Sequence, residues 1–387
     1  MKILFIVPNL VAGGAERQII YLMRGLLERG FSPSLFMLDP VGVFLDEIPY
    51  GVKVYLPKSH RPSNPSMNLV IHHRNPLKTI REIIRVVRKE NPVILYSRHW
   101  PTKIPTAFAG WLLRKKVVLS EVNSLAYEMA YRDTSRRNFY LKNIACRLAD
   151  VIVAVSQGVA DSLDQLFKLN PKVRVIYNGL DLEEIEKKSR EEISHPWFNH
   201  AQPIAVTAGR LVNQKGFVHL LEAVKLVNDK APLRLLIMGD GKLKEELKKR
   251  TEELGIKDKV DFLGVKKNPF AYMARCNLFV LSSLYEGLPN VLVEAMALGL
   301  PVISTNCPYG PSEIIEDGKN GILVPVKNPR AISEAVLKVL GDNQLRDKLR
   351  KEAKIRARDF SLDNMISEYA ELFLSLSARH KTGEILS

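Results

Sequence analysis

Residues 204–217 read IAVTAGRLVNQKGF, and this stretch decides how the rest of the chain is interpreted. Its first five residues are apolar or small, which predicts a buried strand. A loop with two glycines and two basic residues follows, and Phe217 opens an amphipathic segment that predicts a helix over residues 217–227. A strand, a glycine-containing loop and a helix in this order are typical of a βαβ unit in a parallel sheet.

The same alternation runs through the whole chain. Further strands are expected in the first half at residues 3–7, 34–38, 93–96, 116–119, 151–155 and 173–177, with helices that include 15–29 and 77–89. In the second half, strands are expected at 204–208, 233–238, 260–263, 278–281 and 302–305, and helices at 217–227, 242–254, 289–298 and 329–340. The pattern predicts an α/β protein with two parallel sheets.

The alternation stops between residues 181 and 202, where a charged run precedes His195, Pro196 and Trp197. We therefore expect two doubly wound domains, residues 1–185 and 204–360, joined by a linker at 186–203. A C-terminal helix and tail are expected at 361–387. Ligands of such folds bind at the carboxyl ends of the strands, so the two sheets are expected to face one cleft.

Composition excludes several classes of protein. Hydrophobic residues make up 46% and charged residues 26%, which is typical of a folded globular chain. No apolar run approaches the roughly 20 residues that span a bilayer, and residues 3–7 are too few for a signal peptide, so we expect a cytosolic protein. Cys146, Cys276 and Cys307 form no CxxC pair, which argues against disulfides and a zinc site.

The net charge of +15 requires an explanation. A basic surface attracts anionic lipid or phosphorylated substrates, although it can also be simply a solvated face. Nucleic acid is disfavoured because no known binding motif accompanies the charge. Basic residues concentrate between positions 53 and 90: Lys53, Lys58, Arg61, Arg74, Lys78, Arg81, Arg85, Arg88 and Lys89.

One expected helix in this basic segment, residues 77–89, has apolar residues at helical spacing. Leu77, Ile80, Ile84 and Val87 fall on one side, and basic residues fall on the adjoining faces. This describes either an amphipathic helix at a membrane interface or a surface helix packed on its own sheet.

Three loops carry candidate chemistry. Gly13 and Gly14 follow the first strand and open a helix, where the protein backbone can approach a ligand closely and free amides favour an anion. Arg210 and Lys215 lie on one loop, and a guanidinium with an ammonium suits a diphosphate. Each loop could also be an ordinary turn or a solvated basic loop.

The third loop, residues 282–294, reads SSLYEGLPNVLVE. Pro289 suits the first turn of a helix, whose N-terminal amides favour a phosphate. Glu286 and Glu294 flank that turn, and ionised carboxylates accept hydrogen bonds from sugar hydroxyls. Either glutamate alone would usually be a surface residue. The three loops together are a much more specific signal than any one of them.

These loops, with the segments GDG at 239–241 and FLG at 262–264, occur in the order and spacing of a known family. The chain resembles the retaining glycosyltransferases of the GT-B fold, a family of bacterial and archaeal hexosyl-, hexosaminyl- and mannosyltransferases. The resemblance covers essentially the whole chain and is strongest over residues 206–325. It also implies that the C-terminal helix at 361–387 returns to the first domain. The segment CPYGPSE, residues 307–313, further resembles the branch that builds polysaccharides and lipid-linked oligosaccharides.

The resemblance implies a role for each matching residue. Arg210 and Lys215 would hold the donor diphosphate, Glu286 would contact the donor sugar, and Glu294 would bind the ribose. The other implied substrate-binding residues are Gly13, Gly14, Gly209, Gly241, Leu263, Gly264, Leu288, Pro289, Asn290 and Val291. His99 loosely matches a catalytic histidine, against a simpler role in loop packing beside Trp100, and Glu121 matches a strand end that faces substrate.

The implied reaction transfers a hexose or N-acetylhexosamine from a nucleotide sugar, with UDP favoured, to a glycan or polyprenyl-diphosphate-linked acceptor. No cofactor and no metal are expected, because two cations would take the place of a divalent ion. The expected location is the cytoplasmic face of an anionic membrane. The alternatives are an epimerase or phosphorylase on a similar fold, and a non-catalytic nucleotide-sugar-binding scaffold.

Overall fold

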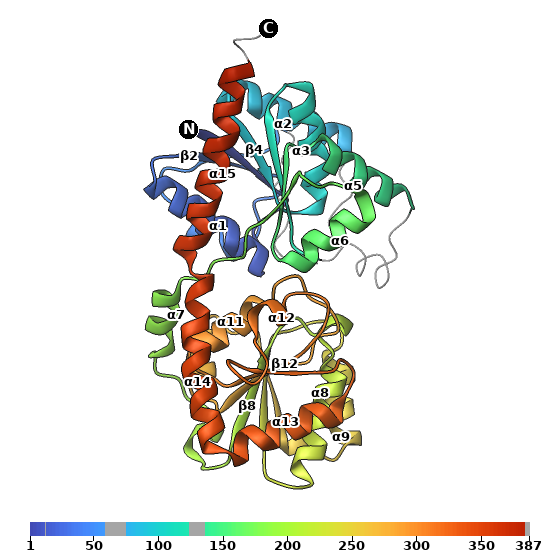
Figure 1. Cartoon of the computed structure of the whole chain (residues 1–387), viewed down its shortest axis with the longest axis vertical. Helices are drawn as coiled ribbons and strands as arrows, with labels where there is room; N and C mark the ends of the chain where they lie inside the picture. The colour runs from blue at the N-terminus through green and yellow to red at the C-terminus, as the bar shows by residue number, and fades with distance from the viewer. Residues whose placement is uncertain (12, 59–74, 124–135, 384–387) are drawn as a thin grey trace. The chain divides into compact units, whose positions relative to one another are not determined.

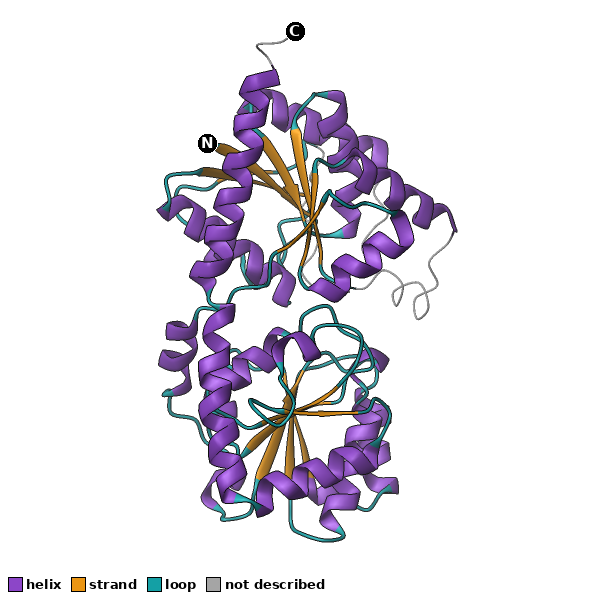
Figure 2. Ribbon diagram, viewed as in Figure 1, coloured by secondary structure: helices purple, strands orange, loops and turns teal. Residues whose placement is uncertain are grey.

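The structure, a computed structural model, describes residues 1–11, 13–58, 75–123 and 136–383. It divides into two compact units: unit 1 is Met1–Gly179 with Asp363–Ser387, and unit 2 is Leu180–Leu362 (Figure 1). In each unit, helices flank a parallel sheet (Figure 2). The expected α/β architecture with two doubly wound sheets is therefore confirmed.

The described part of unit 1 contains a seven-stranded parallel sheet in the order β3-β2-β1-β4-β5-β6-β7. The strands are β1 (Lys2–Val7), β2 (Ser32–Met37), β3 (Lys53–Tyr55), β4 (Ile94–Ser97), β5 (Lys116–Glu121), β6 (Val151–Ala154) and β7 (Val173–Val175). The helical segments are α1 (Gly14–Glu28), η1 (Leu45–Glu47), α2 (Pro76–Glu90), α3 (Trp100–Leu112), α5 (Arg136–Leu148) and α6 (Gln157–Phe167).

The C-terminal helix α15 (Leu362–Gly383) packs on unit 1, as expected. The hydroxyl of Tyr369 lies 3.2 Å from that of Tyr96 on β4, and Phe373 meets the same ring edge-on. Gly25 lets α15 approach α1, because a Cβ at Gly25 would lie 2.0 Å from Ile366 Cδ1. Residues of α15 therefore contribute to the core of the first unit.

The described part of unit 2 contains a six-stranded parallel sheet in the order β10-β9-β8-β11-β12-β13. The strands are β8 (Ile204–Ala208), β9 (Arg234–Met238), β10 (Val260–Gly264), β11 (Leu278–Leu281), β12 (Val302–Thr305) and β13 (Ile322–Val324). The helices are α7 (Leu182–Ser189), α8 (Phe217–Asn228), α9 (Lys244–Glu253), α10 (Pro269–Met273), α11 (Asn290–Ala297), α12 (Pro311–Ile314), α13 (Pro329–Gly341) and α14 (Asn343–Ala357). Short 3₁₀ turns are η2 (Pro196–Asn199), η3 (Asn213–Lys215), η4 (Lys257–Lys259) and η5 (Arg358–Phe360).

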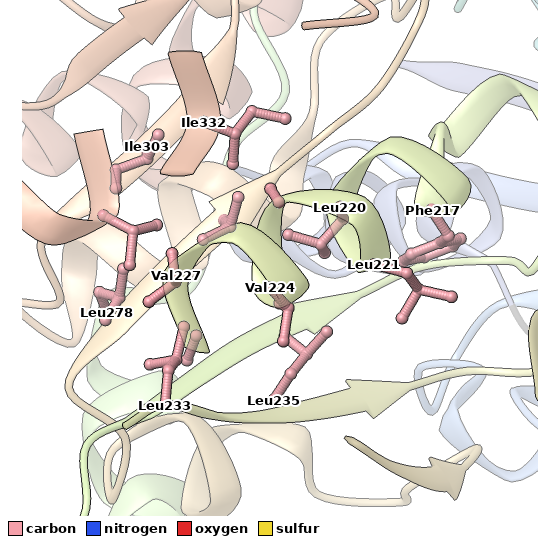
Figure 3. Close-up of a cluster of buried hydrophobic side chains, with 14 of the residues drawn as sticks. Phe217, Leu220, Leu221, Val224, Val227, Leu233, Leu235, Leu278, Ile303 and Ile332 are labelled. Carbon is pink, nitrogen blue, oxygen red and sulfur yellow. The ribbon is translucent and has the colours of Figure 1, made fainter. Parts of the chain in front are cut away.

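A buried cluster holds α8 on the sheet of unit 2 (Figure 3). The buried face of α8 repeats at helical spacing and meets residues from neighbouring strands and from α13. This packing places the start of α8, and the loop before it, at the carboxyl ends of β8 and β11. The labelled members are Phe217, Leu220, Leu221, Val224, Val227, Leu233, Leu235, Leu278, Ile303 and Ile332.

The boundary between the units lies at Gly179 and Leu180, not within the linker expected at 186–203. The reason is that α7, which lies inside the irregular charged stretch, packs on α10 and α11 of unit 2. The return boundary lies at Leu362, close to the expected position 360. The helices α7 and α14 and the edge strands β3 and β13 were not predicted.

The helix expected at residues 77–89 is α2, and it packs on its own unit against α3. Its buried stripe contains Ile83, Val86 and Val87, whereas Leu77 is 69% exposed. The apolar side inferred from the sequence is therefore displaced around the helix. Two basic residues of this region, Arg61 and Arg74, lie outside the described residues.

Candidate active site

The loop after β8 begins the candidate site in unit 2. Gly209 N donates to Met238 O at 2.9 Å, which ties the loop to the end of β9. Gly216 then turns the chain into α8 with φ +61°, a conformation that favours glycine. A Cβ at Gly216 would lie only 2.2 Å from Ser282 O, so this glycine brings the loop directly against the end of β11.

Lys215 and Glu286 form an ion pair within this loop cluster. Lys215 Nζ lies 2.6 Å from Glu286 Oε1, and Ser283 Oγ donates to the same oxygen at 2.5 Å. The side chains of Lys215 and Glu286 are 14% and 7% exposed, so the pair is largely shielded from water. The two residues meet because β8 and β11 are neighbours in the sheet.

The loop after β12 fixes the backbone around Glu286. Glu286 N donates to Pro308 O at 2.9 Å, and Tyr309 N donates to Glu286 O at 3.2 Å. Thr305 Oγ1 donates to Ser283 O at 2.6 Å. The loops after three neighbouring strands, β8, β11 and β12, therefore converge at one edge of the sheet of unit 2.

Helix α11 starts at this convergence. Pro289 is its N-cap and Asn290 its first residue, one position later than predicted. Leu288 is buried, and Val291 and Glu294 are half-buried in the first turns. The N-terminus of a helix carries partial positive charge, so this position favours an anion next to Lys215 and Glu286.

The remaining predicted donor residues lie on the same edge of unit 2. Arg210 is exposed and has no ion-pair partner among the described residues. Gly241 lies against the loop after β8, since a Cβ there would lie 2.5 Å from Leu211 O. Leu263 and Gly264 end β10 where its register with β9 shifts. The structure groups these residues by position, and their roles stay predictions.

In unit 1, the predicted glycine turn adjoins a carboxylate and a histidine. Gly13 is the N-cap of α1, Gly14 is its first residue, and a Cβ at Gly13 would lie 2.3 Å from Glu16 Oε2. Glu16 Oε1 lies 3.2 Å from His99 Nε2. Burial acts to raise the pKa of Glu16, but the close contact with His99, the backbone amide of Glu16 and the charge of Arg98 together lower that pKa.

Glu121, at the end of β5, lies in a buried cluster. Its Oε2 is 2.9 Å from Lys103 Nζ, and the two side chains are 2% and 1% exposed. Lys103 Nζ and Lys142 Nζ lie 4.3 and 4.1 Å from the centre of the Trp100 ring. Burial and the charge of Glu121 raise the pKa of Cys146 to about 12, so this thiol stays protonated at neutral pH.

Comparison with known proteins decides the family. Residues 12–184 match the family described as Glycosyltransferase Family 4, and residues 189–356 match Glycosyl transferases group 1. The uncharacterized glycosyltransferase MJ1059 of Methanocaldococcus jannaschii is 30% identical over 317 residues, which covers 72% of this chain and 74% of that protein. The chain belongs to the glycosyltransferases of the GT-B fold.

Two further similarities concern this glycosyltransferase. It is 29% identical over 366 residues to the N-acetylgalactosamine-N,N'-diacetylbacillosaminyl-diphospho-undecaprenol 4-alpha-N-acetylgalactosaminyltransferase of Campylobacter jejuni, covering 93% of this chain and 95% of that protein. Its fold matches the crystal structure of Anabaena HepE in complex with UDP-glucose, with a TM-score of 0.79 at 23% identity and coverage of 97% and 100%.

Membrane-spanning helices and metal-ligating clusters can be assessed for the residues that the structure describes. Within them, no helix is long and apolar enough to cross a bilayer. The same residues contain no group of three His, Cys, Asp or Glu side chains placed to hold a metal. Metal independence of the transferase reaction stays a prediction.

Sequence reasoning assigned no role to Ser283, Glu16 or Lys103. Ser283 and Glu16 stand within segments that were singled out, yet a serine or glutamate in a loop or first turn carries little signal alone. Lys103 had a clearer signal, because it is a lone charge in the apolar helix WPTKIPTAFAGWL. A lysine in such a helix is rarely buried unless it has a partner.

Proposed function

We propose that this glycosyltransferase transfers a hexose or N-acetylhexosamine from a UDP-sugar to a hydroxyl of a glycan or lipid-linked acceptor, with retention at the anomeric carbon. The observation that carries the proposal is the contact between Lys215 and Glu286 beside the N-terminus of α11. A cation, a carboxylate and a helix N-terminus together complement a phosphate and a sugar hydroxyl.

In the proposed reaction, the bond between the anomeric carbon and the diphosphate oxygen breaks. The acceptor oxygen bonds to the same carbon on the same face, and the acceptor proton passes to the leaving diphosphate. Arg210, Lys215 and the α11 N-terminus stabilise the charge that develops on the diphosphate. Glu286 accepts a hydrogen bond from the transferred sugar, and Glu294 accepts one from the ribose.

The proposed acceptor is a glycan linked to a polyprenyl diphosphate. The name of the Campylobacter jejuni relative states a diphospho-undecaprenol-linked substrate, which supports this class for the present chain. Exposed Lys78, Arg81 and Arg88 on α2 support attachment to the anionic cytoplasmic face of a membrane. Each basic residue near such a leaflet contributes about 1 kcal/mol.

The proposal is tested by incubating the protein with a panel of UDP- and GDP-sugars and a polyprenyl-diphosphate-linked glycan. We expect transfer from a UDP-hexose or UDP-N-acetylhexosamine, and NMR of the product should show the anomeric configuration of the donor. Transfer from GDP-sugars alone would contradict the choice of base, and an inverted product would contradict retention.

The same assay tests metal independence. Because Arg210 and Lys215 are proposed to supply the positive charge, excess EDTA should leave the rate unchanged. Loss of activity on EDTA addition, restored by Mg²⁺ or Mn²⁺, would show that a divalent ion takes part.

A further inference from the structure

Ser283 lies beneath the candidate sugar-binding carboxylate. It lies two residues after the end of β11, and it is 0% exposed. Its Oγ donates to Glu286 Oε1 at 2.5 Å, and Lys215 Nζ contacts the same oxygen at 2.6 Å. Two donors from different loops therefore converge on one oxygen of one carboxylate.

This convergence leaves the other carboxylate oxygen for a ligand. No described residue donates a hydrogen bond to Glu286 Oε2, although an ionised carboxylate offers about four acceptor sites. The terminal torsion of a glutamate is soft, so a carboxylate without anchors rotates readily. Two donors on Oε1 suppress that rotation and set the direction in which Oε2 accepts.

Ser283 is itself held on both sides. Thr305 Oγ1 donates to its carbonyl oxygen at 2.6 Å. The preceding residue, Ser282, donates through its hydroxyl to Lys215 O at 2.8 Å. Ser282 therefore holds the backbone of the loop that carries Lys215. Ser283 contacts the carboxylate of Glu286, with which Lys215 pairs.

We propose that Ser283 is a positioning residue for the transferred sugar. Together with Lys215 it fixes Glu286 Oε1, so that Oε2 accepts a hydroxyl of the donor sugar in one geometry. This inference rests on the proposed function and deepens it, because it assigns Ser283 to the sugar portion of the donor. The nucleotide portion should be bound without its help.

The first test is Ser283→Ala, with Ser304→Ala as the matched control. Ser304 is also 0% exposed and lies on the adjacent strand, but its hydroxyl donates to Thr305 O at 3.0 Å. Calorimetry with UDP measures binding of the nucleotide portion of the donor. Kinetics with the UDP-sugar also report on the sugar portion. For Ser283→Ala we expect UDP affinity within about twofold of wild type, and kcat/KM reduced about tenfold or more, as for a lost hydrogen bond to a charged group.

Ser283→Cys keeps the volume of the buried site and replaces the hydroxyl by a weaker donor. We expect its kcat/KM to lie between those of wild type and Ser283→Ala. If the alanine variant folds poorly, the cysteine variant alone tests the inference by its lowered kcat/KM. Ser304→Ala should retain both UDP affinity and turnover. Equal loss of UDP and UDP-sugar affinity in Ser283→Ala would overturn the inference.

A double-mutant cycle separates positioning from general stability. In a Glu286→Gln background the oriented carboxylate is gone, so adding Ser283→Ala should change kcat/KM less than twofold. Losses that multiply would show that Ser283 acts independently of Glu286, and would overturn the inference.

A wild-type protein that binds and transfers no nucleotide sugar overturns the proposed function itself. If the wild type is active and Ser283→Ala has the same kcat/KM as Ser304→Ala, only the inference about Ser283 is overturned.

Discussion

Lys215 and Arg210 are both proposed to face the donor diphosphate, but their surroundings differ. Arg210 is exposed, whereas Lys215 is the partner of a carboxylate that is 7% exposed. Replacing either by alanine removes a charge from the developing diphosphate, so we expect turnover to fall about 100- to 1000-fold. Only Lys215→Ala leaves a buried acceptor without its cation, at about 1–3 kcal/mol in unfolding free energy.

Urea denaturation and steady-state kinetics on both variants check this difference. Arg210→Ala should unfold at the wild-type urea concentration, and Lys215→Ala at a lower one. Lys249→Ala, an exposed lysine on α9, serves as the control for a lost surface charge. Near-normal turnover in both loop variants would refute the diphosphate assignment.

Glu16 provides a test by pH. Burial acts to raise its folded pKa, but the contact with His99, the Glu16 backbone amide and the charge of Arg98 together lower it from the ordinary value of 4.5. A carboxyl group with a lowered folded pKa contributes stability that is present above about pH 4.5. That contribution is lost as the pH falls through the lower folded value.

We therefore expect the stability difference between wild type and Glu16→Gln to be present above about pH 4.5 and to shrink as the pH falls below that value. Urea midpoints measured at several pH values check this, and subtraction cancels the other carboxylates. Glu28→Gln, at an exposed position of the same helix, should show no comparable trend. A difference that persists or grows as the pH falls below about 4.5 would contradict a lowered pKa of Glu16.

Individual contacts were the least predictable part of the site. The chemistry of Lys215 and Glu286 could be inferred from residue type and loop position, but their ion pair could not. They are 71 positions apart, and they meet only because β8 and β11 are adjacent. Glu121 shows the converse, because its strand-end position was predicted but its buried partner Lys103 was not.

At the scale of elements, Gly216 links the loop after β8 to the end of β11. A side chain there would meet two costs, a left-handed backbone with φ +61° and a Cβ 2.2 Å from Ser282 O. Gly255 offers a matched control, since its φ is +67° but a Cβ would meet nothing within 4 Å. Gly255→Ala should therefore cost only the backbone strain, about 1–2 kcal/mol.

Gly216→Ala should lose more unfolding free energy than Gly255→Ala, because the clash adds to the same strain. It should also weaken donor binding, since Lys215 would be displaced from Glu286. Denaturation midpoints and UDP-sugar affinity measure the two effects. Equal midpoints for the two variants would show that the loop relieves the clash with Ser282 O and that the close approach does not position Lys215.

Strands with a continuous apolar run were predictable, whereas two of the four edge strands of the described sheets, β3 and β13, were not. Buried strands of parallel sheets are continuous apolar runs, so β1 and β8 were predicted to within one residue. The edge strands β3 and β13 have three residues each and are partly exposed, so their sequences lack such a run. In α2 the apolar spacing predicted a helix, but its packing against α3 decided which residues are buried.

At the scale of the whole chain, the number of sheets could be predicted but the domain boundary could not. Two series of alternating strands and helices predict two sheets, and this prediction does not depend on where the linker lies. The boundary depends on where α7 packs, and its charged sequence contains a single buried residue, Ile185. The return of α15 to unit 1 was expected from the resemblance, and the contact between Tyr96 and Tyr369 confirms it.

Attachment to a membrane is the whole-molecule prediction. Arg85 is already bound to Glu82 and to Leu56 O, so the exposed charges of α2 are the better candidates. We expect salt-sensitive sedimentation with anionic liposomes, since such attraction is screened beyond a Debye length of about 10 Å at 0.1 M salt. Binding should be lost in the triple variant Lys78→Glu, Arg81→Glu, Arg88→Glu. It should be retained in the control of equal charge change on unit 2, Lys230→Glu, Lys249→Glu, Lys351→Glu. Wild-type protein that ignores anionic vesicles at low salt, or equal losses in both variants, would show that α2 is only a solvated surface.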